Sequence, residues 1–239
     1  ISENPDNILT LSDYASYTYS QIAYIVNSLN SLLKQHEVRD NDIVTVFVDR
    51  NHWTLITALS CLSQGITYVP IDENHPDKRI EFMIRQSESK AIIVTGAFQK
   101  RVEKIDDESN VNLNIINISS LLDDVKTSNH VDYVDSCVND VACIFYTSGT
   151  TGNPKGIVLA NSNFNAMAMQ ISQLFTKLEV NDHILAIMPI FHGFGLGICV
   201  HTSFCFGLKA ILQPKSERKS LDKLIIDYKP NMVTGVPTI

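Results

Sequence analysis

The sequence is poor in cysteine, in tryptophan and in long apolar runs. Its 239 residues include five cysteines and one tryptophan, and only 19% of them are charged. The cysteines are odd in number and irregularly spaced, which argues against a disulfide-stapled fold and favours a reducing, cytoplasmic setting. No apolar run approaches the roughly 20 residues that span a bilayer, and no basic segment followed by an apolar core marks a signal peptide at the start.

Positive charge is also in short supply. The chain has 19 Lys and Arg against 26 Asp and Glu, a formal net charge of -7. Nucleic acid and anionic membrane surfaces are therefore not expected partners. With 44% hydrophobic residues, the chain has enough apolar material for one large domain or two packed lobes, and too little charge for disorder.

One cysteine-rich segment raises the question of a metal site. Cys199 and Cys205 flank His201, and both cysteine and histidine bind zinc. Both cysteines lie in an apolar stretch, and no fourth ligand is placed nearby. We therefore expect these residues to belong to the core and assign the chain no metal ligands.

Strand and helix patterns alternate along the chain, which predicts an α/β fold with mainly parallel sheets flanked by helices. The expected strands cover residues 43–48, 67–71, 91–95, 113–116, 141–146, 156–159, 184–188, 209–212 and 232–234. The expected helices cover residues 20–34, capped by Ser20, 53–62, which ends before Gly65, 76–87, 162–178, 196–206 and 220–227. Residues 99–139 are polar and are expected to form a connection that contains little regular structure.

We expect two lobes, residues 1–125 and residues 126–239. The chain starts at Ile1 without methionine and ends on the largely apolar run Met232–Ile239. Both ends look cut, so we expect this to be the front portion of a longer protein.

The most informative segment runs from Tyr146 to Gly156. It places four Ser/Thr hydroxyls, three glycines and Lys155 in a turn between two apolar strands. Glycines let the backbone approach a phosphate, successive N–H groups can form an anion-binding nest, and a lysine adds a compact charge. A flexible Ser/Gly linker is the simpler alternative, but apolar strands flank this turn. Lys155 lies between Pro154 and Gly156, so the Gly-Lys-Ser/Thr ending of the nucleoside-triphosphatase loop is absent.

The segment Thr147–Gly156 closely resembles the signature loop of the AMP-forming synthetase superfamily, which includes acyl-CoA synthetases, adenylation domains of peptide synthetases and luciferases. Further segments resemble motifs of the same family in the same order: Gly65–Asp72 followed by Pro76 and Arg79-Ile80, then Pro189–Gly195, then Lys229–Asn231 and Val236–Thr238. The similarity extends from about Leu9 to the end of the chain.

The resemblance implies that this chain is the incomplete N-terminal domain of an adenylate-forming enzyme that uses ATP and Mg²⁺. It assigns the phosphates to Thr147, Ser148, Gly149, Thr150, Thr151, Gly152 and Lys155. It assigns the substrate pocket to His192, Gly193, Phe194, Gly195 and Val236, and catalytic roles to His192 and Lys155. The residues that contact adenine, ribose and Mg²⁺ in the family would lie outside this chain.

The substrate evidence is mixed. Domains specific for α-amino acids resemble Phe-Asp where this chain has His192-Gly193, and Gly193 cannot hold an ammonium group. Thr67–Asp72, however, is more similar to the peptide-synthetase motif. We favour a small apolar carboxylic acid as substrate and coenzyme A or a carrier-protein phosphopantetheine as the thiol acceptor. An amino-acid-activating adenylation domain and a short, non-catalytic protein that binds nucleotide or acyl ligand remain the alternatives.

Overall fold

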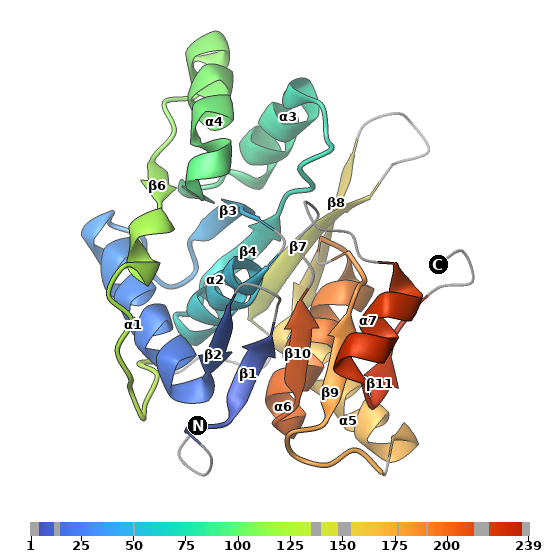
Figure 1. Ribbon diagram of the computed structural model, residues 1–239. Coiled ribbons are helices and arrows are strands. Elements are labelled where there is room, and N and C mark those ends of the chain that lie inside the picture. The colour runs from blue at the N-terminus through green and yellow to red at the C-terminus, as the bar shows by residue number, and fades with distance from the viewer. Residues whose placement is uncertain are drawn as a thin grey trace.

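Two mainly parallel β-sheets organise the computed structural model (Figure 1). The structure describes residues 5–11, 15–49, 51–134, 140–147, 154–175, 177–189, 191–212 and 220–235. Helices flank both sheets, so the predicted α/β fold class is confirmed.

The larger sheet has six strands in the order β6-β5-β3-β4-β7-β8. Its strands are β3 (Ile43–Phe47), β4 (Thr67–Pro70), β5 (Ala91–Val94), β6 (Ile115–Asn117), β7 (Val141–Thr147) and β8 (Lys155–Ala160). All neighbouring strands run parallel except β7 and β8, which form an antiparallel pair. Helices α2 (His52–Ser63), α3 (Asp77–Ser87) and α4 (Gly96–Ser109) lie between successive strands of the chain, as crossovers between parallel strands require.

The smaller sheet has five strands in the order β11-β9-β10-β1-β2. These are β1 (Ile8–Leu11), β2 (Ser16–Thr18), β9 (His183–Ala186), β10 (Lys209–Leu212) and β11 (Met232–Val233). Figure 1 shows the blue strand β1 beside the red-orange strand β10, and Thr10 pairs with Ala210 in parallel register. The two ends of the chain thus build one sheet.

The sheets do not divide at residue 125, where the sequence suggested a boundary between lobes. β7 and β8 come after that point but join the larger sheet, because β7 pairs with β4 through Tyr68 and Cys143. β1 and β2 come before it but join the smaller sheet. Sequence patterns identify strands but not their partners, and partners decide which sheet a strand joins.

The helix that follows β2 begins slightly earlier than expected. α1 (Tyr19–Gln35) is capped by Thr18 rather than by Ser20. The Thr18 hydroxyl accepts a hydrogen bond from the Gln21 backbone N–H at 3.2 Å, and the Gln21 side chain accepts one from the Thr18 N–H at 2.9 Å. This reciprocal capping box fixes the start of the helix.

The polar stretch after residue 99 contains a helix that the sequence did not reveal. α4 spans fourteen residues, and only Val102 and Ile105 on it are buried apolar side chains. Two apolar positions three residues apart form too narrow a stripe to stand out among charged neighbours. The expectation of a connection with little regular structure is therefore wrong for Gly96–Ser109, and it holds better after the short 3₁₀ turn η1 (Ser119–Leu122).

The remaining helices cover the region between the sheets and the face of the smaller sheet. They are α5 (Asn161–Leu174), the π-helix η2 (Gly195–Thr202), α6 (Ser203–Phe206) and α7 (Leu221–Tyr228). One apolar cluster joins elements of both sheets and includes Ile25, Leu55, Tyr68, Phe164 and Leu196. In the part of the chain that the structure describes, no helix combines the length and the apolar character that crossing a membrane requires.

Candidate nucleotide and acyl site

The predicted phosphate loop connects the two strands of the β7–β8 hairpin. Thr147 and Lys155 are directly paired at the end of this hairpin where the loop begins and ends, and both residues are exposed. Opposite residues of an antiparallel pair project to the same face of the sheet, so the Thr147 and Lys155 side chains leave the backbone on one face. Residues Ser148, Gly149, Thr150, Thr151 and Gly152 lie outside the described residues.

The base of this loop is tightly packed. A Cβ added at Gly156 would lie 3.1 Å from the Ile144 side chain and 3.5 Å from the Tyr146 ring, so a larger residue would crowd Ile144 and make an ordinary contact with Tyr146. The Tyr146 hydroxyl donates a hydrogen bond to the Met83 carbonyl at 3.2 Å, which fastens β7 to α3. Burial raises the pKa of Tyr146, so this hydroxyl keeps its proton at neutral pH. The hydrogen bond from Tyr146 to α3 therefore anchors β7 next to Thr147, where the loop begins.

The predicted pocket segment packs against the same hairpin. A Cβ added at Gly193 would lie 3.5 Å from the Phe145 ring on β7 and 3.8 Å from Leu159 on β8. The neighbouring His192 is exposed, and its ring centroid lies 5.1 Å from that of Phe191. The structure thus places Gly193 against the hairpin, with His192 directly before it in the chain.

The other pocket residues have different surroundings. Phe194 is 44% exposed, whereas Gly195 is buried at the start of η2. Val236 lies outside the described residues. The structure therefore places Gly193 beside the hairpin and Gly195 inside the protein, while His192 and Phe194 are exposed.

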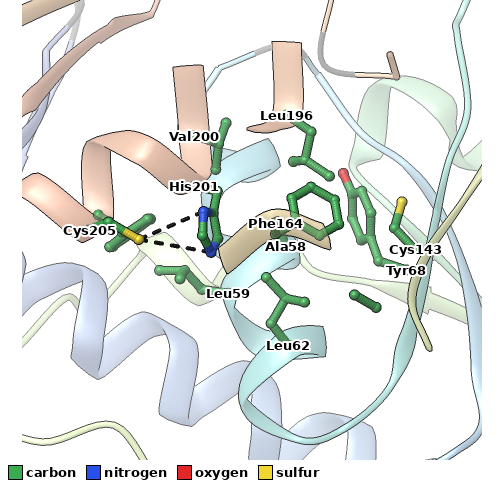
Figure 2. Close-up of a pocket in the computed structure, with 12 residues that line it drawn as sticks. Ala58, Leu59, Leu62, Tyr68, Cys143, Phe164, Leu196, Val200, His201 and Cys205 are labelled. Atoms are coloured by element: carbon green, nitrogen blue, oxygen red, sulfur yellow. Dashed lines mark hydrogen bonds between the residues drawn. The ribbon is translucent and has the colours of Figure 1, made fainter. Parts of the chain in front are cut away.

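An apolar cavity of about 250 Å³ lies beyond this segment (Figure 2). Side chains from α2, β4, β7, α5, η2 and α6 enclose it, including those of Leu59, Leu62, Phe164, Leu196, Val200 and Phe204. Leu196 follows His192 by one helical turn, and its N–H donates a hydrogen bond to the His192 carbonyl at 3.0 Å. The cavity therefore extends along η2 away from His192.

The contribution of α2 to this cavity was missed by sequence reasoning. The signal that could have revealed it is the composition of α2, which is apolar on nearly all sides, with eight of its twelve residues buried. A helix of this kind is surrounded by protein and so contributes to interior surfaces on more than one side.

Two polar side chains, His201 and Cys205, line one end of the cavity. Figure 2 shows them facing one another, and the Cys205 Sγ lies 3.7 Å from the His201 Nδ1. Burial lowers the pKa of His201 and raises that of Cys205, so both are neutral at pH 7. Cys199 instead contacts the Thr234 hydroxyl at 3.2 Å. Among the residues that the structure describes, no group of three or more His, Cys, Asp or Glu side chains could hold a metal ion.

Comparison with protein families gives one match over the whole chain. The family model described as "AMP-binding enzyme" matches residues 1–239. Among curated proteins, N-(5-amino-5-carboxypentanoyl)-L-cysteinyl-D-valine synthase from Penicillium rubens is 31% identical over 171 residues, which cover 68% of this chain and 4% of that protein. Tyrocidine synthase 3 from Brevibacillus parabrevis is 29% identical over 197 residues, which cover 79% of this chain and 3% of that protein.

Solved structures share the fold at lower identity. The N-terminal domain of FACL13 from Mycobacterium tuberculosis superposes with a TM-score of 0.87 at 20% identity, over 99% of this chain and 61% of that one. The o-succinylbenzoate coenzyme A synthetase from Bacillus subtilis, solved with ATP and magnesium ion, gives a TM-score of 0.79 at 20% identity over 96% of this chain and 60% of that one. The chain thus spans under two thirds of these structures and a small part of the curated relatives.

Proposed function

Because this chain belongs to the AMP-binding enzyme family, we propose that it is part of an enzyme that uses ATP to convert a carboxylic acid into an acyl-AMP, with release of pyrophosphate. The observation that carries the proposal is the β7–β8 hairpin, which holds Thr147 and Lys155 side by side at the ends of the predicted phosphate loop. The apolar cavity one helical turn beyond His192 supplies a place for the acyl group.

In the proposed reaction, a carboxylate oxygen forms a bond to the α-phosphorus while the bond from that phosphorus to the β-phosphate bridging oxygen breaks. A carboxylate is already ionised at neutral pH, so no side chain has to remove a proton. The contribution of the protein is in-line positioning and compensation of phosphate charge. Lys155, Thr147 and residues 148–152 would hold the β- and γ-phosphates, and Mg²⁺ would offset further charge when bound.

His192 would lie between the nucleotide and the acyl group. It is exposed beside the hairpin, and the chain runs directly from it into the helix that lines the cavity. Gly193 carries no side chain, and Phe145 and Leu159 lie within ordinary contact distance of the position that a Cβ would take. These positions support a boundary role for His192 and a pocket role for Gly193 and Gly195.

For the substrate we propose an apolar carboxylic acid. The cavity wall is nearly all apolar, and Gly193 offers no carboxylate to an α-ammonium group, whose unpaired burial would be costly. The alternative, an amino-acid-activating domain, is favoured by two of the similar proteins, which are named N-(5-amino-5-carboxypentanoyl)-L-cysteinyl-D-valine synthase and tyrocidine synthase 3.

We further propose that the acyl-AMP is passed to the thiol of coenzyme A or of a carrier-protein phosphopantetheine. The chain would be the front portion of a longer enzyme, and on its own it would bind nucleotide weakly without turning over. Its partial coverage of its structural neighbours supports this view. The four described cysteines are free thiols, which supports placing the enzyme in a reducing compartment such as the cytoplasm. A short, non-catalytic ligand-binding protein is the remaining alternative.

Pyrophosphate exchange in the longer protein tests the proposal. Radiolabelled pyrophosphate should enter ATP only when a carboxylic acid is added, and fatty or aryl acids should support faster exchange than the matching α-amino acids. Production of ADP and inorganic phosphate would contradict adenylate formation. A clear preference for an α-amino acid would favour the adenylation-domain alternative.

A further inference from the structure

A group of basic side chains lies where the chain passes from β4 into α3. His75 is in this turn, and Arg79 is in the first turn of α3. The Nδ1 of His75 and the Nε of Arg79 are buried, and neither has a hydrogen-bond partner among the described residues. Buried polar atoms are almost always paired in folded proteins, so two unpaired nitrogen atoms side by side point to a missing ligand.

The fold places Arg79 at the level of the loop. The Tyr146 hydroxyl bonds to the carbonyl of Met83, one helical turn after Arg79. α3 runs back from the carboxyl end of β4, so Arg79 lies about 6 Å closer to that end than Met83 does. Thr147 lies about 3.3 Å beyond Tyr146 in the same direction. Helical side chains also lean toward the helix N-terminus, which here brings the guanidinium group closer to the loop.

The turn that carries His75 is held rigidly. The guanidinium group of Arg101 donates to the Glu73 carbonyl at 2.7 Å, to the His75 carbonyl, and to the Asp77 carboxylate at 2.8 Å. Arg101 also lies over the Phe47 ring, 5.4 Å from its centroid. The Asp72 carboxylate accepts hydrogen bonds from the Asn74 backbone and side chain at 3.0 and 2.7 Å. The backbone of His75 is therefore held in place by hydrogen bonds within the protein, without the need for a ligand.

The charges around this group leave Arg79 available. Asp77 is paired with Arg101, with 2.7 Å between its Oδ1 and the guanidinium Nη2. The pKa of His75 is lowered by burial and is also affected by four nearby groups, which are Asp72, Arg79, Arg101 and His192. Within the described part of the chain, no carboxylate oxygen lies within 4.0 Å of the Arg79 guanidinium nitrogens. Arg79 is thus a cation close to His75, and it has no partner anion among the described residues.

We propose that Arg79, with His75 beside it, forms an anion-binding arm that contacts the terminal phosphates of the nucleotide and the departing pyrophosphate from the side of α3, together with Lys155 of the hairpin. The inference rests on the proposed function, because that function supplies the phosphates. An arginine fork suits a phosphate, since it can donate two parallel hydrogen bonds to two oxygens of one group. The arm would hold pyrophosphate on one side while Lys155 holds it on the other.

Calorimetric titration of the 239-residue chain with inorganic pyrophosphate tests the arm. We compare the wild type with Arg79→Gln and with Arg85→Gln, which removes the same charge from the same helix two turns later. Arg85 already pairs with Glu81 at 3.0 Å. We expect Arg79→Gln to weaken pyrophosphate binding roughly 10- to 100-fold and Arg85→Gln to leave it unchanged within about twofold.

Thermal unfolding of each variant verifies that it is folded. Arg79→Lys provides a second variant that keeps the charge but loses the fork, and it should bind pyrophosphate with intermediate affinity. Equal affinity in the wild type, Arg79→Gln and Arg85→Gln would overturn the arm, as would a wild-type chain that does not bind pyrophosphate at millimolar concentration. The probe contains neither nucleotide nor acid, so the two proposals can fail separately. Loss of the predicted pyrophosphate binding would overturn the arm even if acid-dependent exchange in the longer protein persists. Absence of that exchange would overturn the proposed function even if pyrophosphate binds as predicted.

Discussion

At the scale of single residues, Lys155 is the side chain on which the proposed phosphate site depends most directly. It is exposed opposite Thr147, so its removal should leave the hairpin folded. A charge-assisted hydrogen bond contributes about 1.5–3 kcal/mol, so Lys155→Ala should slow pyrophosphate exchange in the longer protein roughly 10- to 150-fold. Thr150→Ala should have an effect in the same direction.

Lys104→Ala is a suitable control for this prediction. Lys104 is an exposed lysine on α4 whose ammonium lies 3.6 Å from the Glu108 carboxylate. The control should exchange pyrophosphate at the wild-type rate. If Lys155→Ala matched it, the loop would act as a linker rather than as a phosphate site.

Another residue-scale prediction concerns His52, at the start of α2. Burial lowers the pKa of His52 to about 4, against 6.5 for an exposed histidine. Between pH 6.5 and pH 4 the unfolded chain therefore binds a proton that the folded chain does not, and the free energy of unfolding falls as the pH falls. A shift of this size corresponds to at most about 3 kcal/mol.

Urea unfolding at pH 7 and pH 4.5 measures this effect. His52→Gln should reduce the loss of stability between the two pH values, while His130→Gln, at an exposed position, should not. The lowered pKa values of His75 and His201 act in the same direction, so part of the pH dependence should remain in His52→Gln. An unchanged pH dependence in His52→Gln would contradict the assignment.

At the scale of elements, Gly65 lies in the short turn between α2 and β4. It adopts a φ of +64°, and an added Cβ would lie 3.3 Å from the Val134 side chain. Because this backbone conformation is unfavourable for other L-residues, Gly65→Ala should lower the free energy of unfolding by about 1–2 kcal/mol. Denaturant titration of the chain measures this loss.

Gly96→Ala is the matched control for Gly65→Ala. Gly96 is the first residue of α4, without a positive φ, and its added Cβ would lie 3.4 Å from the Ser119 hydroxyl. This is an ordinary contact, so the change in stability should stay within about 0.5 kcal/mol. Equal losses in the two variants would show that backbone conformation is not the cause.

The elements also show what the sequence could and could not predict. Buried parallel strands such as β3 and β5 are short β-branched runs, and their positions were predicted within a residue or two. α4 was missed because its two buried apolar residues form a narrow stripe. The antiparallel pairing of β7 with β8 was not predicted from the sequence, whereas the two strands, as apolar runs on either side of a glycine-rich turn, were predicted to within a residue. The cavity was not, since its walls come from six elements whose meeting depends on tertiary packing.

At the scale of the whole molecule, each half of the chain contributes strands to both sheets, so the chain cannot be cut at residue 125 without breaking both sheets. A fragment of residues 1–125 would lack β7 and β8, and a fragment of residues 126–239 would lack β1, β2 and the β4 partner of β7. Each would expose sheet edges and the apolar cluster that joins the two sheets. We therefore expect neither fragment to unfold cooperatively alone.

Near-UV circular dichroism and thermal melting of the separate and mixed fragments test this expectation. Mixing should restore a cooperative transition that the separate fragments lack. Cooperative melting of each fragment on its own would show that residues 1–125 and 126–239 are independent lobes in spite of the shared sheets.

The pairing of β1 with β10 also has a consequence for how the chain folds while it is being synthesised. β1 leaves the ribosome about 200 residues before its parallel neighbour β10. At roughly 5–20 residues per second, the wait is about 10–40 seconds. During that time β1, whose Leu9 is fully buried in the finished protein, has only β2 beside it. The nascent chain therefore presents an apolar strand edge that a holding chaperone can bind until translation has passed Leu212.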